Sequence, residues 1–136
     1  MTIPPKSGDD FAGLAAAAAA LQTEVLVIQE VDHNLARTNH ANQCANIALA
    51  MGANDWAFAP GIIGSPEGKW QSADAKIISN QASDAEVESG SYGIGIISKI
   101  KVLKWHRLDL GRSIIGAPLL IPNTETGKAK AIYIKD

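Results

Sequence analysis

A short apolar run, Val-Leu-Val-Ile at residues 25–28, most constrains how this chain can fold. Three of its four residues are β-branched, and an unbroken apolar run of this length is typical of a strand that is covered on both faces. The polar residues Gln29 and Glu30 end the run abruptly. We therefore expect a central strand with an ionisable side chain at its carboxyl end, the position where open α/β sheets bind ligands. A charged residue at a strand end also serves solubility, so position alone leaves both interpretations open.

Segments that favour helix flank this strand on both sides. From Asp10 to Gln22 the chain is rich in alanine, and apolar residues recur at three- and four-residue spacing. A second helix is expected from Asn39 to Met51, with Gly52 just past its end. The positions expected to face the core are Phe11, Leu14, Ala18 and Leu21 in the first helix and Ala41, Cys44, Ala45, Ala48 and Leu49 in the second.

The second half of the chain has the character of successive strands. The polar, acidic stretch 71–91 is expected to be largely mobile, and a turn is expected at 123–127. The order of helix, strand, helix and then several strands predicts the α/β class. We expect a single domain over residues 1–136, with a mixed sheet flanked by helices, as in part of a layered α/β sandwich. The further strand candidates are 56–62, 92–98, 100–110, 117–121 and 130–134, of which 100–110 is expected to be antiparallel and partly exposed.

Composition bounds the partners and the compartment. The chain has 136 residues, 46% of them hydrophobic, which suits one globular domain. A net charge of −2 and the lack of a basic stripe leave nucleic acid possible as a substrate but not indicated by charge. Cys44 is the single cysteine, which excludes an intrachain disulfide and fits a reducing compartment. No apolar run is long enough to span a membrane, and we expect a cytoplasmic protein.

Three segments together resemble the endonuclease/exonuclease/phosphatase superfamily, which includes deoxyribonuclease I-like enzymes. Residues 25–32, VLVIQEVD, are similar to the LQEVD signature of that superfamily. Residues 57–60, AFAP, resemble the strand that follows its second helix, and residues 92–99, YGIGIISK, resemble its YGxAxLSR strand. The segments occur in the family's order, and with the helices they cover nearly the whole chain.

The resemblance implies a divalent-metal-dependent phosphoester hydrolase of the nuclease or phosphatase type. By resemblance Glu30 binds Mg²⁺ or Mn²⁺, hard cations that prefer oxygen ligands. The ion neutralises charge on the phosphoryl oxygens while a water attacks in line. Arg37 lies after the signature, where bacterial relatives often carry an arginine, and is a candidate for contact with the substrate phosphate; a surface role is the alternative. Gln29 belongs to the signature but receives no chemical role, since strand alternation directs it to the other face.

The chain also departs from the family pattern. The family begins with a strand that ends in an Asn, and its later half supplies a His, an Asp-x-Asn pair and a final Asp-His pair; none has a counterpart at the corresponding place here. His33, His40 and His106 do not fall at the family's His positions. The resemblance therefore implies a piece of the family's layered α/β sandwich with an incomplete metal site, lacking the first strand and the C-terminal half, and we expect this chain alone to be a poor catalyst or inactive. The alternative is a non-catalytic remnant or binding module that keeps the scaffold, with self-association through an exposed sheet.

Other residues receive structural interpretations. Cys44 is expected in the core, because a reactive thiolate would need a cationic neighbour or a helix N-terminus. Gly90, Gly93 and Gly95 are expected to permit close strand packing, since no helix follows them whose amides could bind a phosphate.

Overall fold

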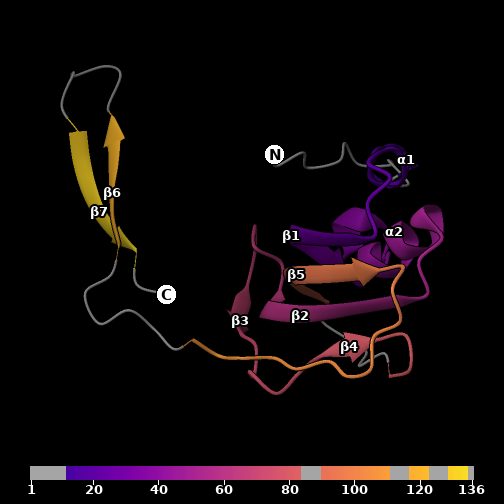
Figure 1. The fold of residues 1–136 in the computed structure, drawn as a ribbon. Helices are drawn as coiled ribbons and strands as arrows, with labels where there is room; N and C mark the ends of the chain where they lie inside the picture. The colour runs from indigo at the N-terminus through magenta and orange to yellow at the C-terminus, as the bar shows by residue number, and fades with distance from the viewer. Residues whose placement is uncertain (1–11, 84–89, 111–116, 123–128, 135–136) are drawn as a thin grey trace.

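The α/β class is confirmed by a computed structural model, which describes residues 12–83, 90–110, 117–122 and 129–134 (Figure 1). One five-stranded sheet carries α2 on one face, and α1 packs against α2. A separate two-stranded sheet is formed by β6 and β7. The elements are α1 (Ala12–Ala20), β1 (Val25–His33), the 3-10 helix η1 (Ala36–Thr38), α2 (Gln43–Met51), β2 (Asp55–Gly64), β3 (Trp70–Ser72), β4 (Ser79–Asn80), β5 (Ser91–Ser98), β6 (Ala117–Pro122) and β7 (Ala129–Ile134).

Strand β5 lies between β1 and β2 in the larger sheet, whose order is β1-β5-β2-β3, with β4 also pairing with β2. Ile97 is aligned with Leu26 of β1 and with Trp56 of β2. The antiparallel pairing that was expected for part of the sheet extends to every ladder of the described strands. Strand β1 is therefore an edge strand among the described elements, and the expectation of a central strand covered on both faces is wrong. The apolar run predicted that residues 25–28 form a strand. Which strands pair with β1 depends on residues far away in the sequence.

Helix α2 begins and ends where its capping residues dictate. The Asn42 side chain accepts a hydrogen bond from the amide of Ala45 at 3.0 Å, and Gly52 ends the helix in the left-handed region with φ 66°. The expected end is confirmed, whereas the helix starts at Gln43 and not at Asn39, because Asn39 and His40 have left-handed φ values of 51° and 58° that an α-helix does not contain. Leu49, expected in the core, is 83% exposed.

The core lies between α2 and the face of the sheet that α2 covers. Ile47, Ala48 and Met51 pack there against buried residues of β2 and β5. Cys44 is buried, as expected, and a Cβ atom added to Gly95 would collide with its Sγ. Gly95 thus lets helix and sheet approach each other. The expected close packing between strands is found at Gly93, where an added Cβ atom would collide with the Ala59 carbonyl of β2. The buried members are Ala18, Val31, Cys44, Ile47, Ala48, Met51, Trp56, Phe58 and Ile97.

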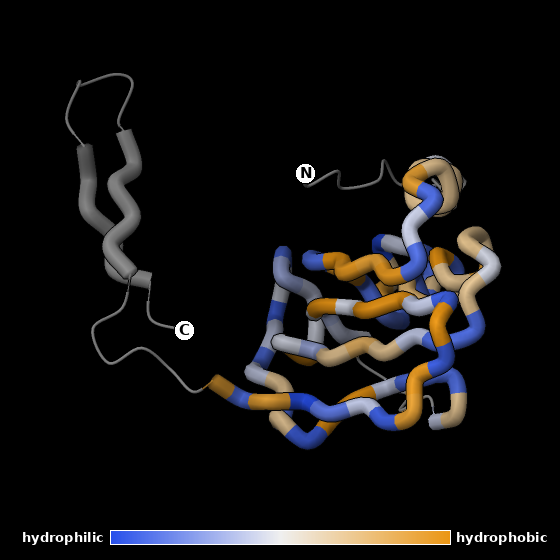
Figure 2. Tube along the Cα trace, in the orientation of Figure 1, coloured by the Kyte–Doolittle hydropathy of each residue, from blue (hydrophilic) through white to orange (hydrophobic). Residues whose placement is uncertain are grey.

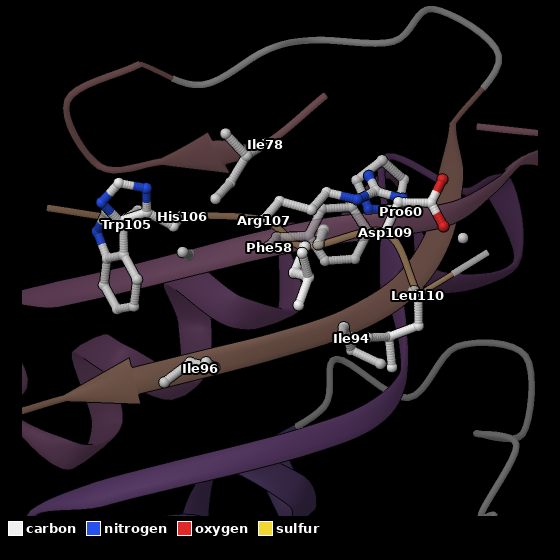
Figure 3. Close-up of a pocket in the computed structure, with 15 residues that line it drawn as sticks. Phe58, Pro60, Ile78, Ile94, Ile96, Trp105, His106, Arg107, Asp109 and Leu110 are labelled. Carbon is white, nitrogen blue, oxygen red and sulfur yellow. The ribbon is translucent and has the colours of Figure 1, made fainter. Parts of the chain in front are cut away.

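The opposite face of the sheet exposes apolar side chains, and much of β1 and β5 has a hydrophobic colour in Figure 2. Val27 of β1 is 63% exposed, and Ile94 of β5 is 51% exposed. Residues 100–110 form no strand, contrary to the expectation; they run as irregular chain. Trp105 to Leu110 form one wall of a shallow pocket of about 320 Å³ on this face, whose floor includes Ile94 and Ile96 (Figure 3). Arg107 connects this segment to the chain before β4, because its Nη1 donates to the carbonyl of Ile77 at 2.8 Å.

The remaining elements agree in part with the sequence. The expected strands at 56–62, 92–98, 117–121 and 130–134 are confirmed. The stretch 71–91 includes part of β3 and all of β4. Residues 84–89 of this stretch lie outside the described residues, as do Phe11 and the expected turn at 123–127.

The first helix buries less than its apolar spacing indicated. Ala18 is buried, but Leu14 is 45% and Leu21 63% exposed. Within the described residues, neither helix has the length and apolar character that crossing a membrane requires.

Candidate functional site at the carboxyl end of β1

Glu30 occupies a β-bulge near the carboxyl end of β1. The register passes from Gln29 opposite Ile94 to Val31 opposite Gly93, so Glu30 has no partner of its own across the strand pair. Its φ of 59° is left-handed, a conformation that costs a non-glycine residue roughly 1–2 kcal/mol. Bulges of this kind re-aim side chains and are common beside active sites. The exposed carboxylate of Glu30 is therefore presented by a strained backbone that the surrounding structure must sustain.

Just after the bulge, Asp32 forms a part-buried ion pair with Arg37. Asp32 is 3% exposed, and its carboxylate accepts from Arg37 Nε at 2.8 Å and from Nη2 at 2.7 Å. This two-point geometry is stronger than a single contact. The hydrogen bonds to Asp32 raise the pKa of Arg37, against the opposing effect of its partial burial.

Arg37 reaches a second carboxylate. Its Nη1 donates to Glu67, in the loop between β2 and β3, at 2.8 Å. Contact between Arg37 and a substrate phosphate stays a prediction. Three of the five guanidinium N–H groups donate to Asp32 and Glu67, so a phosphate would use the remaining N–H groups or replace Glu67, the more exposed partner.

The loop from Asn34 to Asn42 folds back onto the end of β1. The amide of Asn34 donates to the carbonyl of Ala41 at 3.1 Å, and His33 forms a β-bridge with Asn42. The amide of Asp32 donates to Gln43 Oε1, the side chain of the first residue of α2, at 2.6 Å. Asp32 is thus held through its carboxylate by the loop and through its backbone by the helix.

Tyr92 joins this group from the neighbouring strand. It is aligned with Asp32 across the β1–β5 pair, and Arg37 Cζ lies 5.5 Å from the centroid of its ring. Partial burial raises the pKa of Tyr92, the negative charges of Glu30 and Asp32 raise it further, and Arg37 opposes them. The phenol therefore remains protonated at neutral pH, beside the carboxylate of Glu30.

The structure brings Glu30 and Arg37 into one neighbourhood, as their proximity in sequence suggested, and leaves the histidines apart. His33 is buried and stacks on Phe58 with ring centroids 5.3 Å apart. His40 is exposed and contacts Asn34 through its Nδ1 at 3.0 Å. His106 lines the pocket on the open face of the sheet.

Sequence reasoning assigned no role to Asp32, Gln43, Glu67 or Tyr92. Asp32 and Tyr92 lie inside the quoted motifs, so the motifs were a signal for those two. Gln43 and Glu67 carried no signal, because their contacts with the site join residues 11 and 30 positions apart.

The donor set permits a test of the expected metal. No group of three or more His, Cys, Asp or Glu residues capable of holding a metal ion is found among the described residues. Asp32 is engaged by Arg37, which leaves Glu30 as the accessible carboxylate of this group. Mg²⁺ often binds through one or two carboxylates together with waters and substrate phosphates. The residues fit an ion that is shared with a phosphoester substrate, and they do not fit an ion enclosed by protein ligands alone.

Comparison with family models, curated proteins and solved structures gives no match for this chain.

Proposed function

We propose that this chain carries the metal-binding carboxylate of a phosphoester hydrolase that uses Mg²⁺ or Mn²⁺. The observation that carries the proposal is Glu30, an exposed carboxylate held in a left-handed bulge beside the part-buried Asp32–Arg37 pair. Strain of this kind persists where the surrounding structure enforces it and is concentrated at functional sites. The resemblance of residues 25–32 to the superfamily signature supplies the substrate class, a phosphoester.

Each residue of the group has a role in the proposal. Glu30 binds the cation, and the cation, when bound, supplies positive charge that neutralises the phosphoryl oxygens. Tyr92 is protonated at neutral pH, so its hydroxyl donates a hydrogen bond to a phosphate oxygen. Arg37 holds Asp32 in place, and its own positive charge is balanced by the carboxylates of Asp32 and Glu67.

The test is hydrolysis of bis(p-nitrophenyl) phosphate by the purified chain with Mn²⁺ or Mg²⁺. Glu30→Gln removes the charged ligand and keeps the shape of the side chain. Glu24→Gln is the matched control, because Glu24 is also exposed and lies just before the same strand. Metal-dependent hydrolysis that Glu30→Gln abolishes and Glu24→Gln preserves would support the proposal. Equal rates in both variants, or no hydrolysis by the folded wild-type chain, would count against activity of this chain.

A binding module is the second candidate, and the open face of the sheet favours it. Val25, Val27, Ile94 and Ile96 form an exposed apolar patch on adjacent strands β1 and β5. Patches of this kind mark interaction surfaces. We propose a second copy of this chain as the partner, in line with the expected self-association.

Sedimentation at several protein concentrations tests this candidate. Val27→Lys places a charge within the patch and is expected to shift the chain towards monomer. Leu49→Lys is the control, since Leu49 is also apolar and, at 83%, is more exposed than Val27 at 63%, but lies on α2. A wild-type chain that is monomeric at every concentration would exclude the candidate.

We also propose a cytoplasmic location. The single cysteine, Cys44, is buried and cannot form an intrachain disulfide, which agrees with a reducing compartment without requiring one. Detection of a tagged chain in cell fractions measures the location directly.

A further inference from the structure

Gln43 is a buried polar residue whose side chain serves a different element from its own. It is the first residue of α2 and is 4% exposed. Its Oε1 accepts the amide of Asp32 in β1 at 2.6 Å. The start of the helix has its own cap, because Asn42 accepts the amide of Ala45. The Gln43 side chain is therefore not needed to cap α2, and its contact acts on the strand.

The contact lies where the bulge needs support. Glu30 is held at φ 59°, and a strained backbone persists only when its surroundings fix it. Val31, the next residue, is buried in the core, and the residue after it, Asp32, has its backbone fixed by Gln43 and its carboxylate by Arg37. Without the Gln43 contact, the Asp32 amide would lose its partner and the strand could extend by removing the bulge.

We infer that Gln43 is a positioning residue that keeps Glu30 in its left-handed bulge by holding the amide of Asp32. The structural half of this inference stands on the contact itself, while its effect on metal binding rests on the proposed function. Removal of a group that holds a metal ligand in its orientation, without touching the metal, typically weakens metal binding by about 10- to 100-fold. Gln43 thus couples the start of α2 to the carboxylate that the proposed site presents.

Three variants separate positioning from simple stabilisation. Gln43→Leu removes the acceptor at similar volume, and Gln43→Glu keeps an oxygen at the same place. Asn46→Leu is the control, because Asn46 is exposed on the same helix. If Gln43→Leu does not fold, Gln43→Met replaces it, since the unbranched methionine side chain adapts to its surroundings.

The first readout is structural and needs no metal. NMR reports the left-handed backbone of Glu30 through its Cα and Cβ chemical shifts, and hydrogen exchange reports the protection of the Asp32 amide. In Gln43→Leu we expect Asp32 to exchange about fivefold faster or more, and Glu30 to lose its left-handed shifts. Asn46→Leu should match the wild type, and Gln43→Glu should keep the wild-type Glu30 shifts at a lower free energy of unfolding, because it buries a carboxylate near Asp32. Unchanged Glu30 shifts in folded Gln43→Leu would overturn the inference.

The second readout is Mn²⁺ binding, measured by the paramagnetic relaxation of water. We expect Gln43→Leu to weaken Mn²⁺ about tenfold and Gln43→Glu to restore the affinity. A wild-type chain that binds no Mn²⁺ would count against the proposed function, and the structural readout would still decide the role of Gln43. Equal Mn²⁺ affinity in Gln43→Leu and the wild type would refute its effect on the metal.

Discussion

Arg37 holds the carboxylate of Asp32 at two points, with Nε 2.8 Å from Oδ2 and Nη2 2.7 Å from Oδ1. The two residues are separated by the turn that follows β1, so their pairing closes the loop against the strand that carries Glu30. Asp32 is buried whereas the Arg37 side chain is 27% exposed. Removal of Arg37 would leave a buried, unpaired carboxylate and would therefore lower the free energy of unfolding.

Loss of Arg37 should destabilise the fold through Asp32. In Arg37→Ala the buried carboxylate has no cation, and we expect the free energy of unfolding to fall by about 2–3 kcal/mol. Glu67→Gln, which removes the exposed partner of the same guanidinium, should change it by less than about 0.5 kcal/mol. Urea denaturation of both variants measures the difference. A similar decrease in the free energy of unfolding in both variants would show that the burial of the Asp32 carboxylate does not account for the effect of Arg37→Ala.

The titration of Tyr92 should report the charge of Glu30. The pKa of Tyr92 is raised above 10.0 by partial burial and by the charges of Glu30 and Asp32, so Glu30→Gln should lower it. The absorbance of phenolate at 295 nm, compared with Tyr92→Phe, measures the shift. A Tyr92 pKa that is unchanged in Glu30→Gln would place the carboxylate farther from the phenol than the structure has it.

The same titration sets the direction of the pH dependence. Above pH 10 an unfolded Tyr92 is deprotonated while the folded one keeps its proton, so the folded state binds more protons and stability decreases as pH rises. The contribution is fully present below pH 10 and is lost as pH rises through the raised pKa. The wild type should therefore lose stability faster than Tyr92→Phe in this range, measured by urea denaturation.

Replacement of Glu30 by glycine should stabilise the chain. Glycine adopts the left-handed region without the steric cost that a side chain incurs, and we expect a gain of about 1 kcal/mol. Glu24→Gly, outside a left-handed position, should give no gain. Thermal unfolding of the two variants measures this. A stabilised Glu30→Gly that no longer binds Mn²⁺ would show that the wild-type residue is retained at the expense of stability.

Gly95→Ala should be strongly destabilising. The added Cβ would collide with the Sγ of Cys44 and approach Ile28 Cγ1 to 3.1 Å, and overpacking of this kind costs about 3 kcal/mol. Gly61→Ala is the control, because the nearest atom to its Cβ would be the Tyr92 carbonyl at 3.8 Å. Combining Gly95→Ala with Cys44→Ala should recover part of the loss, which a double-mutant cycle in urea measures. Additive losses would mean that the helix does not approach the sheet at Gly95.

The candidate site could be foreseen only in part. Glu30 was singled out because it ends an apolar run and belongs to the LQEVD-like segment, and Arg37 because it follows that segment. The bulge that presents Glu30 arises from the register between β1 and β5, more than 60 positions apart in the chain, and no local pattern encodes it. The partners Gln43 and Glu67 were missed for the same reason.

The sequence by itself determined the local elements. The strand with the apolar run at 25–28, the strands at 56–62 and 92–98 and the glycine that ends α2 are set by short-range preferences of side chain and backbone. Tertiary structure decided that β1 lies at an edge, that Leu49 faces solvent and that Glu30 stands in a left-handed bulge. These depend on which distant segments pair and pack, because hydrogen-bond register and burial are properties of two surfaces in contact and not of either one alone.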